Sequence, residues 1–168
     1  MKILAPLLAL TICYALFAAY LISSYDSLPE RVASHFDING QPNGWMSRQN
    51  CVEFTVGLGV FLPALIVGMM ALSGRIPVSF VNLPHRDYWL APERRKATLS
   101  LLLLYGLWLA CLTVLFATGT HWLTVRANTT GGPVHLDYPR FFLVLGGFLF
   151  GILVWTCLLL LHFRRIPE

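Results

Sequence analysis

Five ionisable side chains in this sequence could do acid–base or metal chemistry. They are His35, Asp37, His121, His135 and Asp137. Imidazole nitrogens are common zinc ligands, and a carboxylate beside a metal-bound water can act as a general base. One hypothesis is therefore a metal-dependent membrane enzyme, with the three histidines as metal ligands and either aspartate as the base.

The spacing of these residues gives that hypothesis little support. The sequence contains no HExxH motif, and His35 and His135 share only an H-x-D pattern that His85 repeats. It also lacks a Gly-x-Ser-x-Gly nucleophile elbow. We therefore expect no catalytic, cofactor-binding or metal site, and we interpret the histidines as hydrogen-bonded structural or interfacial groups.

The composition of this sequence is unusually apolar. Of the 168 residues, 57% are hydrophobic and only 12% are charged, far from the composition of soluble domains. About 20 apolar residues are needed to cross roughly 30 Å of hydrocarbon. Four runs of that size lie at about residues 3–22, 54–72, 97–120 and 141–161. The sequence predicts an all-α integral membrane four-helix bundle, with residues 1–168 as a single transmembrane domain.

The position of the charged residues excludes two classes of function. No Asp, Glu, Lys, Arg or His lies at mid-depth of a predicted span, although ion-coupled transporters need such groups there. The net charge of +4 is concentrated in one loop and the C-terminal tail, which indicates membrane topology and attraction to anionic lipid. We expect contact with the lipid bilayer and no binding of nucleic acid.

The basic residues also predict the sidedness of the chain. With four spans, both termini and the middle loop share one side, which carries eight Lys and Arg residues against four on the other side. The positive-inside rule then places the termini and middle loop in the cytoplasm. The eight are Lys2, Arg75, Arg86, Arg94, Arg95, Lys96, Arg164 and Arg165, and the four are Arg31, Arg48, Arg126 and Arg140.

The first loop on the predicted outer side contains an 18-residue polar segment, residues 28–45. Leu28, Val32 and Phe36 recur at four-residue spacing, and Pro29 suits the first position of a helix. This pattern predicts a short extracytoplasmic surface helix between the first two spans.

The rest of this loop contains turn signals. Asn39-Gly40 and Pro42-Asn43-Gly44 are turn-forming sequences, and Trp45 follows at the expected headgroup level. Asn50 and Glu53 resemble a capping box for the second span. We expect a loop that folds back on itself before that helix starts.

Three further positions within and beside the spans carry predictions. Pro63 predicts a kink near the middle of the second span. Pro92 predicts the start of the third helix. Gly147 and Gly151 form a GxxxG spacing that favours close helix packing, either within the chain or in a homodimer.

Several residues in the two polar loops occur in the pattern of a known family. They are Leu28-Pro29, His35-Phe36, Gly40, Pro42, Gly44-Trp45, Asn82-Leu-Pro84 and Tyr88-Trp-Leu-Ala-Pro-Glu-Arg-Arg95. Over about residues 23–96 the chain resembles the N-terminal membrane domain of unknown function of the SdpI-type immunity proteins, also found alone in small four-helix proteins.

That resemblance implies a multi-pass protein of the bacterial cytoplasmic membrane. The family's namesake protects cells from a secreted, membrane-active peptide toxin. By resemblance we expect a non-enzymatic protein that binds a peptide, lipid or protein partner through its extracytoplasmic loop, in immunity or envelope stress. The candidate recognition residues are Pro29, His35, Phe36, Gly40, Gly44, Trp45, Asn82, Pro84, Tyr88, Trp89, Pro92 and Glu93.

Overall fold

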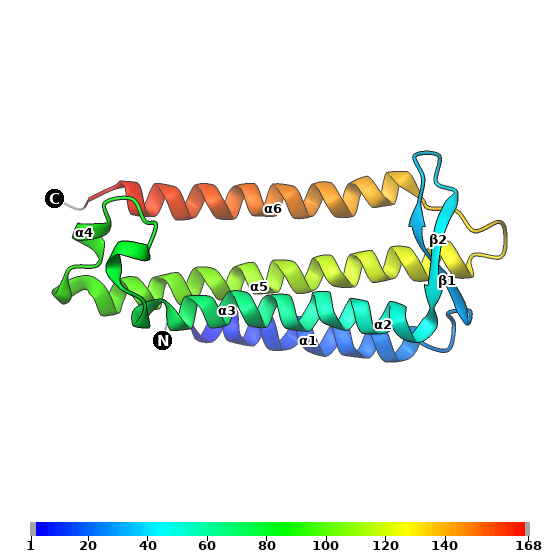
Figure 1. The fold of residues 1–168 in the computed structure, drawn as a ribbon, viewed down its shortest axis with the longest axis horizontal. Helices are drawn as coiled ribbons and strands as arrows, with labels where there is room; N and C mark the ends of the chain where they lie inside the picture. Colours follow the sequence, from blue (N-terminus) through cyan, green and yellow to red (C-terminus); the bar gives the residue numbers. More distant parts are fainter. Residues whose placement is uncertain (1–2, 167–168) are drawn as a thin grey trace.

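Four long helices run side by side in the computed structural model, which describes residues 3–166 (Figure 1). Each is long and apolar enough to cross a membrane. They are α1 (Leu4–Ser24), the continuous helix Arg48–Arg75, α5 (Pro92–Thr129) and α6 (Tyr138–Arg164). The helix Arg48–Arg75 consists of α2 (Arg48–Val56), the π-helical η1 (Gly57–Phe61), α3 (Leu62–Leu72) and the 3₁₀ turn η2 (Ser73–Arg75).

Shorter elements occupy the two ends of the bundle. A β-hairpin of β1 (Arg31–Phe36) and β2 (Pro42–Ser47) lies across one end, called here the hairpin end (Figure 1). The 3₁₀ turn η3 (Val78–Phe80) and the short helix α4 (Arg86–Trp89) lie at the other, where both termini also lie, called here the terminal end. Lys2, which contributes to the predicted sidedness, is outside the described residues.

The predicted all-α membrane bundle is confirmed, and its helices are longer than the apolar runs. The third helix begins at Pro92 as predicted, but it continues to Thr129, nine residues beyond the predicted span. The second begins at Arg48 and not near residue 54. Polar residues can continue a helix beyond its apolar stretch. Hydropathy therefore locates the membrane-spanning part of a helix but does not locate the helix ends.

Helix α5 is the centre of the bundle, because α1, α3 and α6 each pack against it. Ala110, Val114 and Ala117 on α5 are fully buried. Glycines make two of the helix contacts close: a Cβ on Gly106 of α5 would meet Met70 of α3, and one on Gly59 of η1 would meet Phe17 of α1. Small residues at such crossings let helix backbones approach within a membrane.

Helix α6 packs antiparallel on α5 through contacts spaced along its length. Phe116 and Phe148 stack with ring centroids 4.2 Å apart. Nearer the terminal end, the Trp155 indole N–H donates to the Tyr105 carbonyl oxygen at 2.9 Å, and the Tyr105 hydroxyl donates to the Leu158 carbonyl at 3.2 Å. These bonds satisfy polar groups that would otherwise face hydrocarbon.

The irregularity in the second span is a π-helical turn at residues 57–61, immediately before Pro63. Proline has no N–H to give to the preceding turn, and its ring crowds the carbonyl there. A π turn accommodates such a disruption within an otherwise continuous helix. The sequence predicted a kink near Pro63; the structure has a π-helical turn beside it, and the kink itself stays a prediction.

The predicted surface helix at residues 28–36 is wrong, because residues 31–36 form strand β1. Arg31, Val32 and Ala33 pair with Ser47, Met46 and Trp45 in an antiparallel ladder. A helix of about nine residues has little stability of its own, whereas the strand gains a partner across the turn. Asn39-Gly40 lies in that turn, as predicted, but Pro42-Asn43-Gly44 lies in β2 and is not a turn.

The predicted capping box of the second span is also wrong. The N-cap is Ser47, whose hydroxyl accepts a hydrogen bond from the Asn50 N–H at 3.1 Å. Glu53 instead accepts from the Gln49 side-chain amide at 2.8 Å. Ser47 is both the last residue of β2 and the N-cap of α2. Because the sequence did not predict β2, it did not predict this cap.

Candidate recognition site at the hairpin end

The turn of the hairpin is organised by Asp37. Its carboxylate Oδ1 accepts from the N–H groups of Asn39 at 2.8 Å and Gln41 at 2.9 Å. Its own N–H donates to the Gln41 carbonyl at 2.9 Å, and Gly40 donates back to the Asp37 carbonyl at 3.0 Å. Asp37 is thus a turn-forming residue whose carboxylate is engaged by backbone, and this explains its presence without catalysis.

The tip of the hairpin is docked on the loop between α5 and α6. The Gly40 carbonyl accepts from the Leu136 N–H at 3.0 Å, and Nε2 of His135 lies 3.0 Å from the Asn39 carbonyl oxygen. The Tyr138 hydroxyl donates to the Asp37 carbonyl. Gly40 has φ +77° and is buried, and a Cβ there would lie 2.6 Å from Cε1 of His135. Glycine is required here by both its backbone conformation and the close approach.

Strand β1 is attached to the bundle by the side chain of Asn128 on α5. Its Oδ1 accepts from the Ala33 N–H at 2.8 Å, and its Nδ2 donates to the Ala33 carbonyl at 3.0 Å. The amide therefore takes the place that a neighbouring strand would occupy. Val32 and Ala33 are fully buried beneath it. One edge of the two-stranded sheet is closed in this way.

The opposite edge of the sheet, along β2, is open. Because both backbone groups of Ala33 point to Asn128, Ala33 and its partner Trp45 form a non-hydrogen-bonded pair. The Arg48 N–H donates to the Glu30 carbonyl at 3.0 Å, so Glu30 and Arg48 form a hydrogen-bonded pair. Hydrogen-bonded and non-hydrogen-bonded pairs alternate along an antiparallel ladder, and counting back from this pair also makes Ala33–Trp45 a non-hydrogen-bonded pair. The backbone groups of Trp45 and the N–H of Ser47 consequently point away from β1, where no described residue bonds them.

Exposed side chains lie along the hairpin. Trp45, on the open edge, is 41% exposed, with the Arg31 guanidinium over its ring at 5.2 Å from the centroid. Ile38, beside the turn, is 91% exposed. An exposed tryptophan in contact with an arginine is typical of protein contact surfaces.

A cavity of about 420 Å³ opens beside the hairpin, between β1, α5 and the start of α6. Its lining is mainly apolar and includes Phe36, Leu123, Leu136 and Phe141. Two of the predicted recognition residues, His35 and Phe36, contribute to it. The open edge and this cavity belong to the same hairpin, and together they define the candidate site.

The three histidines of the metal hypothesis do not come together. His121 is buried in the bundle, with Nε2 3.0 Å from Ser24 Oγ and Nδ1 3.3 Å from Thr55 Oγ1. His135 contacts Asn39, and His35 lies beside Ser34 with Nδ1 3.0 Å from its hydroxyl. Among residues 3–166, no three His, Cys, Asp or Glu side chains are grouped so that they could hold a metal ion. The ligand set proposed for the enzyme alternative is not assembled.

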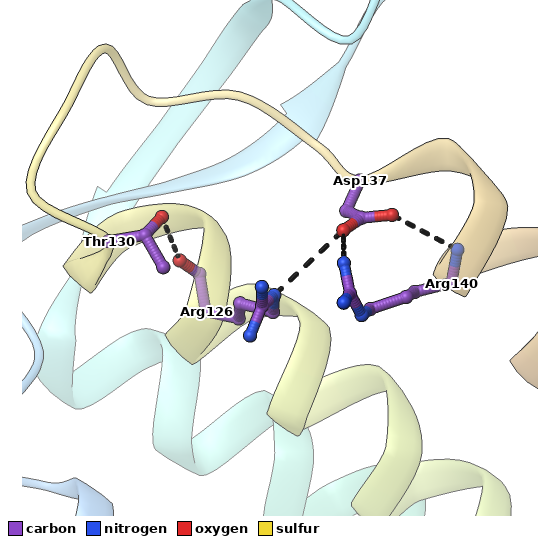
Figure 2. A network of polar contacts seen from close by, with 4 residues as sticks. All are labelled: Arg126, Thr130, Asp137 and Arg140. Carbon is purple, nitrogen blue, oxygen red and sulfur yellow. Dashed lines mark hydrogen bonds and ion pairs between the residues drawn. The ribbon is translucent and has the colours of Figure 1, made fainter.

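Asp137, the second candidate base, is an N-cap of α6 (Figure 2). Its Oδ1 accepts from the Arg140 N–H at 3.2 Å, and its Oδ2 contacts the Arg140 guanidinium and, at 3.9 Å, that of Arg126 on α5. A carboxylate held by a helix start and two arginines ties the ends of α5 and α6 together.

The predicted set divides between opposite ends of the bundle, because six candidate residues lie at the terminal end: Asn82, Pro84, Tyr88, Trp89, Pro92 and Glu93. The Trp89 indole donates to the Phe163 carbonyl at 2.9 Å, and its carbonyl accepts from the Thr98 hydroxyl at 2.7 Å. Pro92 occupies the first turn of α5, with Glu93 beside it. These contacts join α4, α5 and α6 and give Trp89 a role in packing. Pro29 and Gly44 stay with the hairpin, while Asn82, Pro84 and Tyr88 stay with the middle loop.

Sequence reasoning missed Asn128, Tyr138, Ser24 and Thr55, which position the hairpin and His121. Nothing in their local pattern distinguishes them from ordinary polar residues near helix ends. Each of these residues bonds a partner about 66 to 101 residues away in the sequence. Their roles can therefore be seen only in the folded structure.

In a comparison with protein families, residues 7–67 match a family described as a domain of unknown function (DUF1648). The matched region holds most of α1, the whole hairpin, α2, η1 and the first half of α3, and it ends before the middle loop. Comparison with curated proteins and with solved structures finds no match. The matched region is therefore the hairpin together with the helices that precede and follow it in the sequence.

Proposed function

We propose that this chain is a non-enzymatic bacterial membrane protein of the SdpI-like type, whose hairpin end faces the outside of the cytoplasmic membrane and binds an extended peptide segment. The observation that carries the proposal is the open edge of β2 on a hairpin that is otherwise fixed to the bundle. The bound segment belongs to a secreted, membrane-active peptide or to a membrane protein partner.

The binding mode follows from the strand geometry. An extended peptide can add to an open sheet edge by main-chain hydrogen bonds, while side-chain contacts select its sequence. Trp45 supplies two backbone groups and Ser47 one N–H along this edge. The stacked Trp45 and Arg31 side chains offer an apolar face and a cation beside it.

The attachment of the hairpin supports recognition by lowering the entropic cost of binding. Asn128, Leu136 and Tyr138 fix β1 and the turn to α5 and α6 before a partner arrives. A preorganised edge loses little conformational freedom when it binds. The positive-inside rule supports the orientation, because the basic residues are concentrated at the other end.

The experiment is a protection assay in the native host. A deletion strain is challenged with a panel of membrane-active peptides and complemented with the wild-type chain or with a triple variant of His35, Phe36 and Trp45 to alanine. We expect the wild-type chain to restore resistance to at least one peptide and the triple variant to fail.

The matched control replaces residues of the same types elsewhere: Phe80 and His85 at the terminal end and Trp108 on α5, all exposed. Equal membrane levels of the variants are checked by immunoblot. If both triple variants protect as well as the wild type, or if the wild type protects against no peptide, the hairpin end is not a recognition surface for such peptides.

A further inference from the structure

A second cavity lies at the terminal end, away from the hairpin, on the surface of α5 between the start of α1 and the end of α6. Its volume is about 540 Å³. Its lining combines cationic or polar groups with aliphatic ones. The main contributors are Trp89, Arg94, His162, Ile3, Leu101 and Leu104.

The charged and apolar groups are separated along the helix axis. Arg94 lies in the first turn of α5, whereas Leu101 and Leu104 lie seven and ten residues further into the helix. At about 1.5 Å per residue, they are roughly 10 and 15 Å deeper than Arg94. The cavity therefore has a cationic mouth at the level of the bundle end and an apolar floor within the span.

The Arg94 guanidinium is held in place by the protein while one terminal nitrogen stays free. Its Nε donates to the Tyr88 carbonyl at 2.9 Å, its Nη2 lies 2.9 Å from Glu93, and it stacks on the Tyr88 ring at 4.0 Å. Its Nη1 has no hydrogen-bond partner among residues 3–166. A fixed guanidinium with an open donor suits a phosphate oxygen.

The surroundings of the cavity favour an anion. The described part of the terminal end carries seven basic residues and two acidic ones, Asp87 and Glu93. His162 is exposed at the cavity, and its ring lies beside the Trp89 and Phe163 rings. Basic pockets between membrane helices are typical sites for anionic lipid headgroups.

We infer that this cavity binds one anionic phospholipid from the leaflet that the terminal end faces. Its phosphate contacts Arg94 and His162 at the mouth, and an acyl chain lies against Ile3, Leu101 and Leu104. The separation of charge and apolar surface along α5 matches a molecule with a charged head and a hydrocarbon tail. This site is independent of peptide binding at the hairpin end.

The test is native mass spectrometry of the full chain in mild detergent, titrated with phosphatidylglycerol or with phosphatidylcholine of the same acyl chains. We expect tighter retention of phosphatidylglycerol. Arg94→Gln should weaken that retention about five- to tenfold, while Arg75→Gln, which removes an equal charge outside the cavity, should leave it unchanged. Ala97→Phe should weaken it by filling the cavity, without touching a charge.

Three results would overturn the inference. Equal binding of the two lipids would exclude recognition of the anionic head. Equal weakening by Arg94→Gln and Arg75→Gln would indicate general attraction to net charge. Displacement of the lipid by millimolar inorganic phosphate would indicate a plain anion site. If Arg94→Gln does not fold, the result for Ala97→Phe tests the inference instead. Ala97 lines the cavity, so undiminished binding of phosphatidylglycerol in Ala97→Phe would show that the lipid binds elsewhere.

Discussion

Asn128 ties the hairpin to the bundle most directly, because one side-chain amide satisfies both backbone groups of the fully buried Ala33. The position of the hairpin depends on a few polar side chains that form hydrogen bonds with backbone groups. Asp37 shapes the turn, Gly40 permits its close docking, and His121 joins hydroxyl groups from α1 and α2. Hydrogen bonding accounts for Asp37 and His121, and backbone conformation accounts for Gly40.

Replacing Asn128 with alanine should loosen β1 without unfolding the helices. The buried N–H and C=O of Ala33 would lose their partners, at a cost of about 1–3 kcal/mol. We expect the Ala33 amide to exchange with deuterium roughly 10- to 100-fold faster in lipid nanodiscs. Asn43→Ala, at an exposed position on β2, is the control. Unchanged exchange at Ala33 would show that Asn128 does not hold the strand.

Replacing Gly40 with alanine should undock the tip of the hairpin. A side chain would be strained at φ +77° and would overlap His135, with a combined cost of about 1–3 kcal/mol. We expect a lower thermal midpoint and faster exchange at the Leu136 amide. Gly132→Ala, where an added Cβ meets nothing closer than 3.6 Å, should change neither. Equal effects of the two substitutions would contradict the docking described here.

At the scale of elements, α6 packs along α5 through regularly spaced contacts, and it also bonds α4 at one end and the hairpin turn at the other. The two glycines of its GxxxG sequence differ in environment. A Cβ on Gly151 would lie 2.9 Å from Leu112 of α5, whereas one on Gly147 would meet nothing within 4 Å. Gly151 therefore serves packing within the chain, and Gly147 is the position open to a second copy.

These two positions make a matched pair for substitution. Gly151→Leu should separate α6 from α5 and lower the thermal midpoint, since overpacking costs about 1–3 kcal/mol. Gly147→Leu should leave the thermal midpoint of the monomer unchanged. If a homodimer forms through this face, Gly147→Leu is instead the variant that weakens it, as measured by cross-linking in membranes. Loss of monomer stability in Gly147→Leu alone would contradict the packing.

The secondary-structure elements that the sequence predicted correctly are those that a single strong local signal determines. Long apolar runs gave the four helices, Pro92 gave a helix start, and Asn39-Gly40 gave a turn. The helix prediction for residues 31–36 is wrong because the four-residue spacing of Val32 and Phe36 fits both a helical stripe and a strand with irregular register. The attachment of the hairpin depends on Asn128 and Tyr138, which lie about a hundred residues away. Local periodicity carries no information on such contacts.

At the scale of the whole molecule, the bundle has two unlike ends: a hairpin with an open strand edge and a basic end that holds both termini. The proposed function requires that the hairpin end face outward. In a variant whose four native cysteines are replaced by alanine, Ile38→Cys should react with an impermeant maleimide in intact cells. Ser79→Cys should react only after permeabilisation. The reverse pattern would invert the orientation.

Ser47 offers the sharpest test of peptide binding at the open edge. Its φ of −66° already suits proline, and its N–H points away from β1, so Ser47→Pro removes an edge donor without breaking the hairpin ladder. Ser47→Ala loses the same capping hydroxyl but keeps the N–H. The two variants thus share the loss of the helix cap, about 1 kcal/mol, and differ at the edge.

The decisive measurement is the growth of the deletion strain, complemented with each variant, in the presence of a membrane-active peptide against which the wild-type chain protects. Our account predicts that Ser47→Ala still protects and that Ser47→Pro, at equal membrane levels, does not. Equal protection by the two variants would contradict recognition through the open edge of β2.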